Sequence, residues 1–241
     1  MVISQEEKYI FIHIPKTAGT FLTHGMQNGT GVCLESIVDR NGSTHEIKTH
    51  AGALQLKTIF GEAYDHFFSF AFVRNPWDRM VSLYNFKLQS AQLRVKGKRP
   101  LKPGISREDD MKEIVYLSTL GFERWLLEGD CDSSIYGESL TRLPQLCWLT
   151  DQDGNLIVSH VARFEDLQPE LEKLQDRFKM KFEVQTGNSS IHAPWQLYYS
   201  QETFSCVKER FHADITMFGY QIGWDEVEES KNKFPGHLSA F

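Results

Sequence analysis

The sequence is poor in the features that stabilise small secreted domains or hold structural metals. It has only four cysteines, and no two of them form a Cys-x-x-Cys pair. They are Cys33, Cys131, Cys147 and Cys206. This wide spacing excludes a disulfide framework and a zinc-binding motif, and it predicts four buried thiols.

Long hydrophobic runs are also missing. The first apolar run, Tyr9–Ile14, has six residues. A signal peptide needs a basic start and a longer run, and a membrane span needs about 18 apolar residues. With Met1 as its first residue, the sequence therefore predicts a cytoplasmic protein without stable membrane insertion.

Positive charge is not in excess, since 26 Lys and Arg residues stand against 32 Asp and Glu residues, a net charge of −6 at pH 7. This balance argues against a general binder of nucleic acid or other polyanions, so any anion site must be local. A chain of 241 residues that is 41% hydrophobic is typical of a globular protein. We expect one domain over residues 1–241, whereas the oligomeric state does not follow from the composition.

Apolar runs and turn residues predict alternating strands and helices. Residues 8–14 and 67–73 are predicted strands, and each precedes a polar loop and a helix. Two predicted helices begin near Phe21 and at Pro76, and three more span about 110–127, 167–178 and 201–211. A hairpin is predicted at 149–161, and the C-terminal tail is predicted to be irregular. Such strand–loop–helix units predict an α/β fold with a mainly parallel sheet flanked by helices on both sides.

Residues 94–107 differ from the rest of the chain, because they contain six Lys or Arg residues and no acid among Pro and Gly residues. The composition predicts a solvated loop. The alternatives are a segment that steers an anionic substrate and a mobile lid.

The loop after the first predicted strand has the residues of an anion site. It comprises Pro15, Lys16, Thr17, Ala18, Gly19 and Thr20. The N–H groups and the dipole at the start of a helix favour an anion, and Lys16 adds a positive charge. The threonine hydroxyls add donors, and Gly19 allows the backbone to approach a phosphate closely. In a Walker A loop the glycines precede the lysine, whereas here Lys16 comes first, and an ordinary strand–helix loop is the alternative.

A second motif follows the strand at 67–73. Arg74 leaves the carboxyl end of this strand, where ligands bind in open α/β sheets, and a guanidinium can grip a phosphate with two hydrogen bonds. Asp78 and Ser82 lie one helical turn apart, so the Ser82 hydroxyl can face the same phosphate. A capped helix with an exposed arginine is the alternative.

Together, the two motifs resemble those of sulfotransferases that use 3′-phosphoadenosine 5′-phosphosulfate (PAPS). IPKTAGT resembles the 5′-phosphosulfate loop, and FVRNPWDRMVSLYNF resembles the 3′-phosphate motif, with its Arg and Ser eight residues apart. LTDQDGNLIVSHVARFEDL and NSSIHAPWQLYYSQET resemble later segments of the family. The variant is similar to the carbohydrate branch, which includes heparan 2-O- and chondroitin sulfotransferases.

The resemblance implies a P-loop-kinase-like fold. It also implies transfer of a sulfuryl group from PAPS to an acceptor hydroxyl on a small molecule or glycan, most plausibly a sugar or glycoconjugate, with PAP as the product. By the same resemblance, residues 15–20 bind the phosphosulfate, and Arg74 and Ser82 bind the 3′-phosphate. Ser190 or His192, in a later segment, is a candidate contact to the nucleotide, and a plain polar loop is the alternative.

In-line sulfuryl transfer needs a cation over the leaving phosphate, a base for the hydroxyl and alignment of the two. Lys16 is the predicted cation. His50 is the predicted base, because it lies 24 residues before Arg74, a spacing similar to that of the catalytic histidine segment in the family. A loop histidine bonded to the backbone is the alternative. A neutral imidazole can accept a proton near pH 7. His13, within the first strand, is predicted to be a satisfied core residue.

No metal is predicted, because a sulfuryl group carries less charge than a phosphoryl group and no acidic cluster flanks either loop. Two other functions stay open. An ATP-dependent small-molecule kinase would need a metal-binding carboxylate and a Walker lysine. A non-catalytic nucleotide-binding protein would tolerate the loss of Lys16 and His50.

Overall fold

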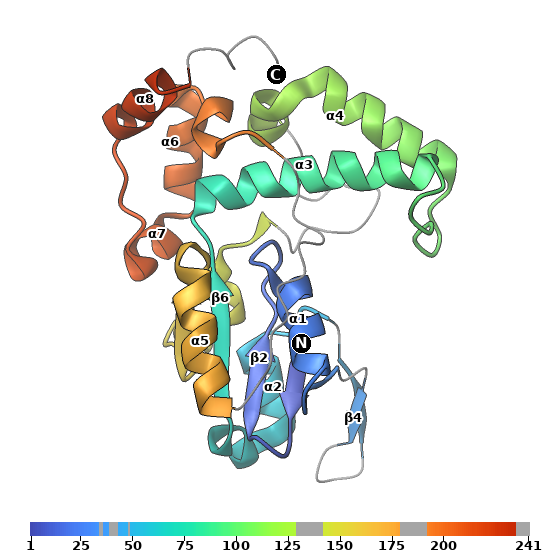
Figure 1. Cartoon of the computed structure of the whole chain (residues 1–241), viewed down its shortest axis with the longest axis vertical. Helices are drawn as coiled ribbons and strands as arrows, with labels where there is room; N and C mark the ends of the chain where they lie inside the picture. The colour runs from blue at the N-terminus through green and yellow to red at the C-terminus, as the bar shows by residue number, and fades with distance from the viewer. Residues whose placement is uncertain (34–35, 39–42, 48, 129–141, 179–191, 235–241) are drawn as a thin grey trace. The chain divides into compact units, whose positions relative to one another are not determined.

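The computed structural model describes residues 1–33, 36–38, 43–47, 49–128, 142–178 and 192–234 (Figure 1). The chain forms two compact units. The first comprises Met1–Asn75 and Gln145–Asn188, and the second comprises Pro76–Pro144 and Ser189–Phe241. Ser190 and Cys131 lie outside the described residues.

The first unit contains a five-stranded sheet in the order β3-β1-β2-β6-β7. The strands are β1 (Val2–Ser4), β2 (Tyr9–Ile12), β3 (Val32–Cys33), β6 (Phe68–Val73) and β7 (His160–Arg163). β2, β6 and β7 are parallel, whereas β1 pairs antiparallel with both β2 and β3. The predicted α/β class and its two strands are confirmed, but the sheet is mixed because β1 and β3 add an antiparallel edge.

Both faces of β2 and β6 are buried, which explains why each strand is a continuous apolar run rather than an alternating one. On one face, Phe11 pairs with Phe70 in register, and their rings lie 5.4 Å apart. α1 (Gly19–Gln27) and α5 (Leu167–Phe178) pack on these rings (Figure 1). Leu22, Met26, Leu171, Leu174 and Phe178 are their buried contacts.

The predicted helix at 167–178 is therefore confirmed, and the helix predicted from Phe21 begins two residues earlier. Other elements of this unit are β4 (Ser36–Val38), β5 (Thr44–Glu46), α2 (Ala53–Phe60), and the 3-10 helices η1 (Gly61–His66), η3 (Gln145–Trp148) and η4 (Phe164–Asp166). β4 and β5 form a separate antiparallel pair. The predicted turn at Asp153-Gly154 closes a bridge between Thr150 and Leu156, with Gly154 at a φ of 83°.

The second unit is helical. It contains α3 (Pro76–Val95), α4 (Arg107–Glu128), η5 (Trp195–Tyr198), α6 (Gln201–Arg210), α7 (His212–Phe218) and α8 (Trp224–Asn232). The predicted helix start at Pro76 and the helix at 201–211 are confirmed. The prediction of an irregular tail was wrong. α7 ends at Gly219 in a left-handed conformation, and the Glu226 carboxylate accepts a 2.8 Å hydrogen bond from the Gly223 N–H at the start of α8.

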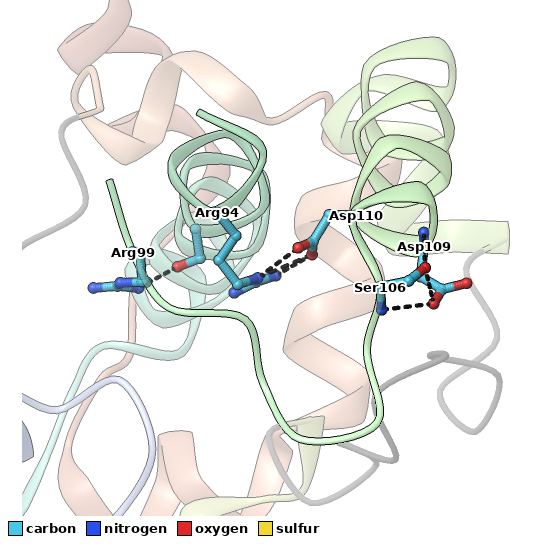
Figure 2. A network of polar contacts seen from close by, with 6 residues as sticks. Arg94, Arg99, Ser106, Asp109 and Asp110 are labelled. Atoms are coloured by element: carbon cyan, nitrogen blue, oxygen red, sulfur yellow. Dashed lines mark hydrogen bonds and ion pairs between the residues drawn. The ribbon is translucent and has the colours of Figure 1, made fainter. Parts of the chain in front are cut away.

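α3 and α4 run along each other and are joined by the basic stretch (Figure 1). The prediction that this stretch is solvated was wrong for Arg94, which is 4% exposed. Its guanidinium binds both carboxylate oxygens of Asp110, with distances of 2.6–2.9 Å (Figure 2). Arg99 donates to the Ser90 hydroxyl at 2.7 Å.

α4 begins three residues before the predicted position, and the cause is a local cap (Figure 2). The Ser106 N–H and hydroxyl donate to the Asp109 carboxylate at 2.9 and 2.7 Å, and the Asp109 N–H donates to the Ser106 hydroxyl oxygen at 3.1 Å. This reciprocal pattern starts a helix at the next residue.

The prediction of four buried thiols was also wrong for the described residues. Cys33 and Cys147 are exposed, and Cys206 is partly exposed. Cys33 lies on β3, the edge strand of the sheet.

Candidate functional site

The turn between β2 and α1 has an unusual backbone. Lys16 and Ala18 have φ angles of 70° and 62°, in the left-handed region that L residues rarely adopt. Among the described non-glycine residues, only Lys8 shares this feature. Ala18 caps α1 and provides no side-chain acceptor to the first turn. Strained turns of this kind occur at functional sites, and a helix start without a side-chain cap favours an anion.

The threonines of this turn differ in their surroundings. Thr17 is fully buried, and its hydroxyl donates to the Ile14 carbonyl oxygen at 3.0 Å. This hydrogen bond therefore stabilises the turn. Thr20 is exposed on α1, and Pro15 is buried.

Arg74 lies directly after β6, and its guanidinium reaches the turn. Nη1 donates to the Lys16 carbonyl oxygen at 3.3 Å, and Cζ lies 4.5 Å from the centre of the Phe164 ring. The structure therefore brings the guanidinium of the second motif to the main chain of the first. Because β2 and β6 are neighbouring parallel strands, the residues after both strands meet at one edge of the sheet.

Gln145 holds the main chain of Arg74, and the sequence analysis did not identify it. Its Oε1 accepts from the Arg74 N–H at 2.8 Å, and its Nε2 donates to the Arg74 carbonyl oxygen at 2.9 Å. The next N–H, of Asn75, donates to the Glu165 carboxylate at 2.7 Å. Gln145 is fully buried but 71 residues from Arg74, so no local pattern connects the two.

His50 lies beside the same strand end. Its Nδ1 is 2.8 Å from the carbonyl oxygen of His13. A carbonyl oxygen only accepts, so Nδ1 carries the proton, and in the neutral ring Nε2 holds the lone pair. The Trp148 indole N–H donates to the His50 carbonyl oxygen at 3.0 Å and fixes the main chain there.

His13 itself is buried, as predicted, but not satisfied. Its ring centre is 4.5 Å from that of His50 in an edge-on arrangement. Burial, followed by the charge of His50, lowers the pKa of His13 to about 2, so its ring is neutral. Within the described chain, its Nδ1 has no hydrogen-bond partner.

Gly19 has a steric role that the sequence analysis did not foresee. A Cβ at this position would lie 1.8 Å from Cδ2 of His13 and 2.0 Å from its Nε2. Because Gly19 has no side chain, the His13 ring can lie beside it. This adds to the close approach of a phosphate that the sequence predicted for Gly19.

The sequence profile of the sulfotransferase family matches residues 1–221. The chain belongs to the sulfotransferase family. Neither the curated proteins nor the solved structures gave a match. Membership identifies the chain as a transferase of sulfuryl groups, which requires an acceptor substrate.

Two residues predicted to serve this sulfotransferase lie outside the described residues of the first unit. Ser82 belongs to the second unit, where it lies on α3 and is buried. Ser190 lies outside the described residues. His192, near it in the sequence, has its Nδ1 2.8 Å from the Ala193 carbonyl oxygen.

The described residues include no group of three or more His, Cys, Asp or Glu side chains that could hold a metal ion. Of the helices in the described ranges, none combines the length and apolar character needed to cross a membrane.

Proposed function

We propose that this sulfotransferase transfers a sulfuryl group from PAPS to a hydroxyl on a sugar or glycoconjugate, with PAP as the product. The observation that carries the proposal is the hydrogen bond from the Arg74 guanidinium to the Lys16 carbonyl oxygen. It joins the two motifs that resemble the 5′- and 3′-phosphate segments of PAPS-dependent enzymes. A nucleotide with phosphates at both positions needs such a pair of cationic segments at one sheet edge.

The residues of the first unit fit this donor. The helix start at Gly19 has no side-chain cap, and Lys16 adds a positive charge to the preceding turn. We assign residues 15–20 to the phosphosulfate, Arg74 and Ser82 to the 3′-phosphate, and Ser190 to a further nucleotide contact. The order of β2, turn and α1 supports a P-loop-kinase-like arrangement. Because the family match runs through both units, we treat residues 1–241 as one sulfotransferase domain.

PAPS would supply the sulfuryl group when bound: a bond from the acceptor oxygen to sulfur would replace the bond from sulfur to the 5′-phosphate oxygen, whose electrons would stay on the phosphate. His50 accepts the proton of the acceptor hydroxyl at Nε2, since the carbonyl oxygen of His13 holds the proton on Nδ1. Lys16 stabilises the negative charge that grows on the leaving phosphate. Arg74 holds a phosphate that does not react, so it contributes to binding and alignment.

The donor is tested by comparing PAP with 5′-AMP, which lacks the 3′-phosphate. At about 100 times its dissociation constant, PAP should stabilise the protein by roughly 2.7 kcal/mol, and 5′-AMP at the same concentration should stabilise it far less. Thermal unfolding measures both. Equal shifts for the two nucleotides would contradict the proposed donor.

The role of Lys16 is tested by Lys16→Ala. We expect kcat to fall by about 10²–10³-fold, with a smaller change in PAPS binding, because the charge on the leaving phosphate is largest in the transition state. Lys57→Ala is the matched control, since Lys57 is a half-exposed lysine of the same unit that pairs with Asp65. An equal loss in both variants would contradict a specific role for Lys16.

A further inference from the structure

His13 contacts two parts of the candidate donor site, His50 and the start of α1, yet the scheme gives its side chain no chemical step. Its ring lies against the ring of His50 and against Gly19, the first residue of α1. Its carbonyl oxygen accepts the hydrogen bond from Nδ1 of His50. One residue thus connects the end of β2, the start of the helix and the predicted base.

The contact with Gly19 leaves no room for adjustment. A Cβ on Gly19 would meet three atoms of the His13 ring within 2.7 Å. His13 is 7% exposed, and its ring also stacks on Phe11 with 6.0 Å between ring centres, so the ring is enclosed on more than one side. Gly19 is not among the described glycines with a positive φ, so the space and not the backbone conformation requires glycine here.

One nitrogen of the His13 ring makes no hydrogen bond within the described chain. Nδ1 of His13 is buried and has no partner in the described part of the chain, and an unsatisfied buried nitrogen normally costs stability. Burial and the charge of His50 lower its pKa to about 2, so the ring stays neutral and adds no charge beside Lys16. What the ring supplies is therefore a flat, neutral spacer.

We propose that His13 is a positioning residue of the donor site: its ring sets the separation between the start of α1 and His50, and its carbonyl oxygen holds His50 in the tautomer that accepts a proton. The inference rests on the proposed PAPS-dependent transfer, because it assigns His13 to the geometry of that reaction.

The steric part is tested by a compensating pair of substitutions. Gly19→Ala is expected to weaken PAP binding by about 10–100-fold, because an added methyl group forces the ring and the turn apart. Gly29→Ala is the matched control, since its Cβ would meet only the Met26 carbonyl oxygen at 3.5 Å. Combining Gly19→Ala with His13→Ala should restore most of the lost affinity. If Gly19→Ala does not fold, restored folding in the double variant is the supporting result, and an unrescued double variant overturns the proposal.

The effect on His50 is tested through kcat and KM. His13→Ala should lower kcat by about 10–100-fold through misplacement of the base, with KM for PAPS changed by less than roughly threefold. His13→Phe keeps a flat ring without nitrogens and should retain most of the turnover. A Phe variant as slow as the Ala variant would overturn the spacer role, because it would assign the effect to the ring nitrogens. Wild-type protein that fails to bind PAP would instead contradict the proposed function, so the two failures are distinguishable.

Discussion

The molecule uses buried or half-buried arginine in two ways, at Arg74 in the first unit and at Arg94 in the second. The Arg94 guanidinium binds both oxygens of the Asp110 carboxylate, so its charge is neutralised inside the helical unit. The Arg74 guanidinium rests on the Phe164 ring and donates to a carbonyl oxygen. Both of these partners are uncharged, whereas the partner of Arg94 is a carboxylate. The comparison teaches that arginines of two basic motifs can have partners of different charge, which the density of basic residues does not indicate.

The largest expected effect tests whether the chemistry belongs to the first unit. His50→Ala should reduce kcat by roughly 10²–10⁴-fold while PAP affinity stays near that of the wild type, because the imidazole contacts the acceptor proton and not the nucleotide. A base must be unprotonated, so the wild-type rate falls as the pH falls, and this acid limb should disappear in the variant. Steady-state kinetics across pH measure both.

His66→Ala is the control for that variant, since His66 is an exposed histidine of the same unit. Near-wild-type turnover of a folded His50→Ala enzyme would place the base elsewhere. His45 and Glu46 on β5 would then be the next residues to test.

The next largest effect concerns stability rather than catalysis. Arg94→Ala leaves the Asp110 carboxylate buried without its partner, which should lower the free energy of unfolding by about 3–5 kcal/mol. The turnover of the remaining folded protein should be unchanged if the charge of Arg94 serves only the fold. Denaturant unfolding and activity per folded molecule check the two statements.

Two further variants serve as controls for the Arg94→Ala result. Arg94→Met with Asp110→Leu removes both charges and should recover most of the stability. Arg124→Ala removes an exposed arginine that pairs with Glu128 on α4 and should leave stability nearly unchanged. A large loss of turnover per folded Arg94→Ala molecule would show that Arg94 also serves catalysis, so that its role would no longer differ from the one proposed for Arg74.

Of the structural features that surround Arg74 and Arg94, the sequence predicted those that depend on local patterns. The apolar runs predicted the strands β2 and β6 and the basic residue that follows each of them, whereas the meeting of Lys16 and Arg74 at one sheet edge follows from the parallel pairing of the two strands. The pairing of Arg94 with Asp110 was not predicted, because it depends on how α3 and α4 pack and not on the intervening loop. Gln145 and the contact between His13 and Gly19 were missed for the same reason.

Arg74→Ala is the direct counterpart of the Arg94 variant, with a smaller effect on a different quantity. We expect PAP to bind about 10–100-fold more weakly, the loss of roughly 1.5–3 kcal/mol from hydrogen bonds to a charged group, with unfolding affected little. Binding of 5′-AMP should hardly change, so calorimetry of both nucleotides isolates the 3′-phosphate. Arg163→Ala is the matched control, because Arg163 ends the neighbouring strand β7 and is exposed. Equal weakening of both nucleotides would contradict the assignment of Arg74 to the 3′-phosphate.

The smallest expected effect is none, on removal of metal ions. If Lys16 and Arg74 supply the positive charge at the donor phosphates, a chelator should leave the rate of sulfuryl transfer nearly intact. The argument depends on charge, since a sulfuryl group carries less negative charge than a phosphoryl group and fixed side-chain cations can balance the leaving phosphate. A kinase reaction, in contrast, needs a metal ion to bridge the phosphates. The measurement compares initial rates before and after EDTA, with magnesium added back. A complete loss that magnesium restores would favour a kinase. It would also show that Arg74 and Lys16 do not by themselves supply the positive charge at the donor phosphates, and their proposed role would then differ less from that of Arg94.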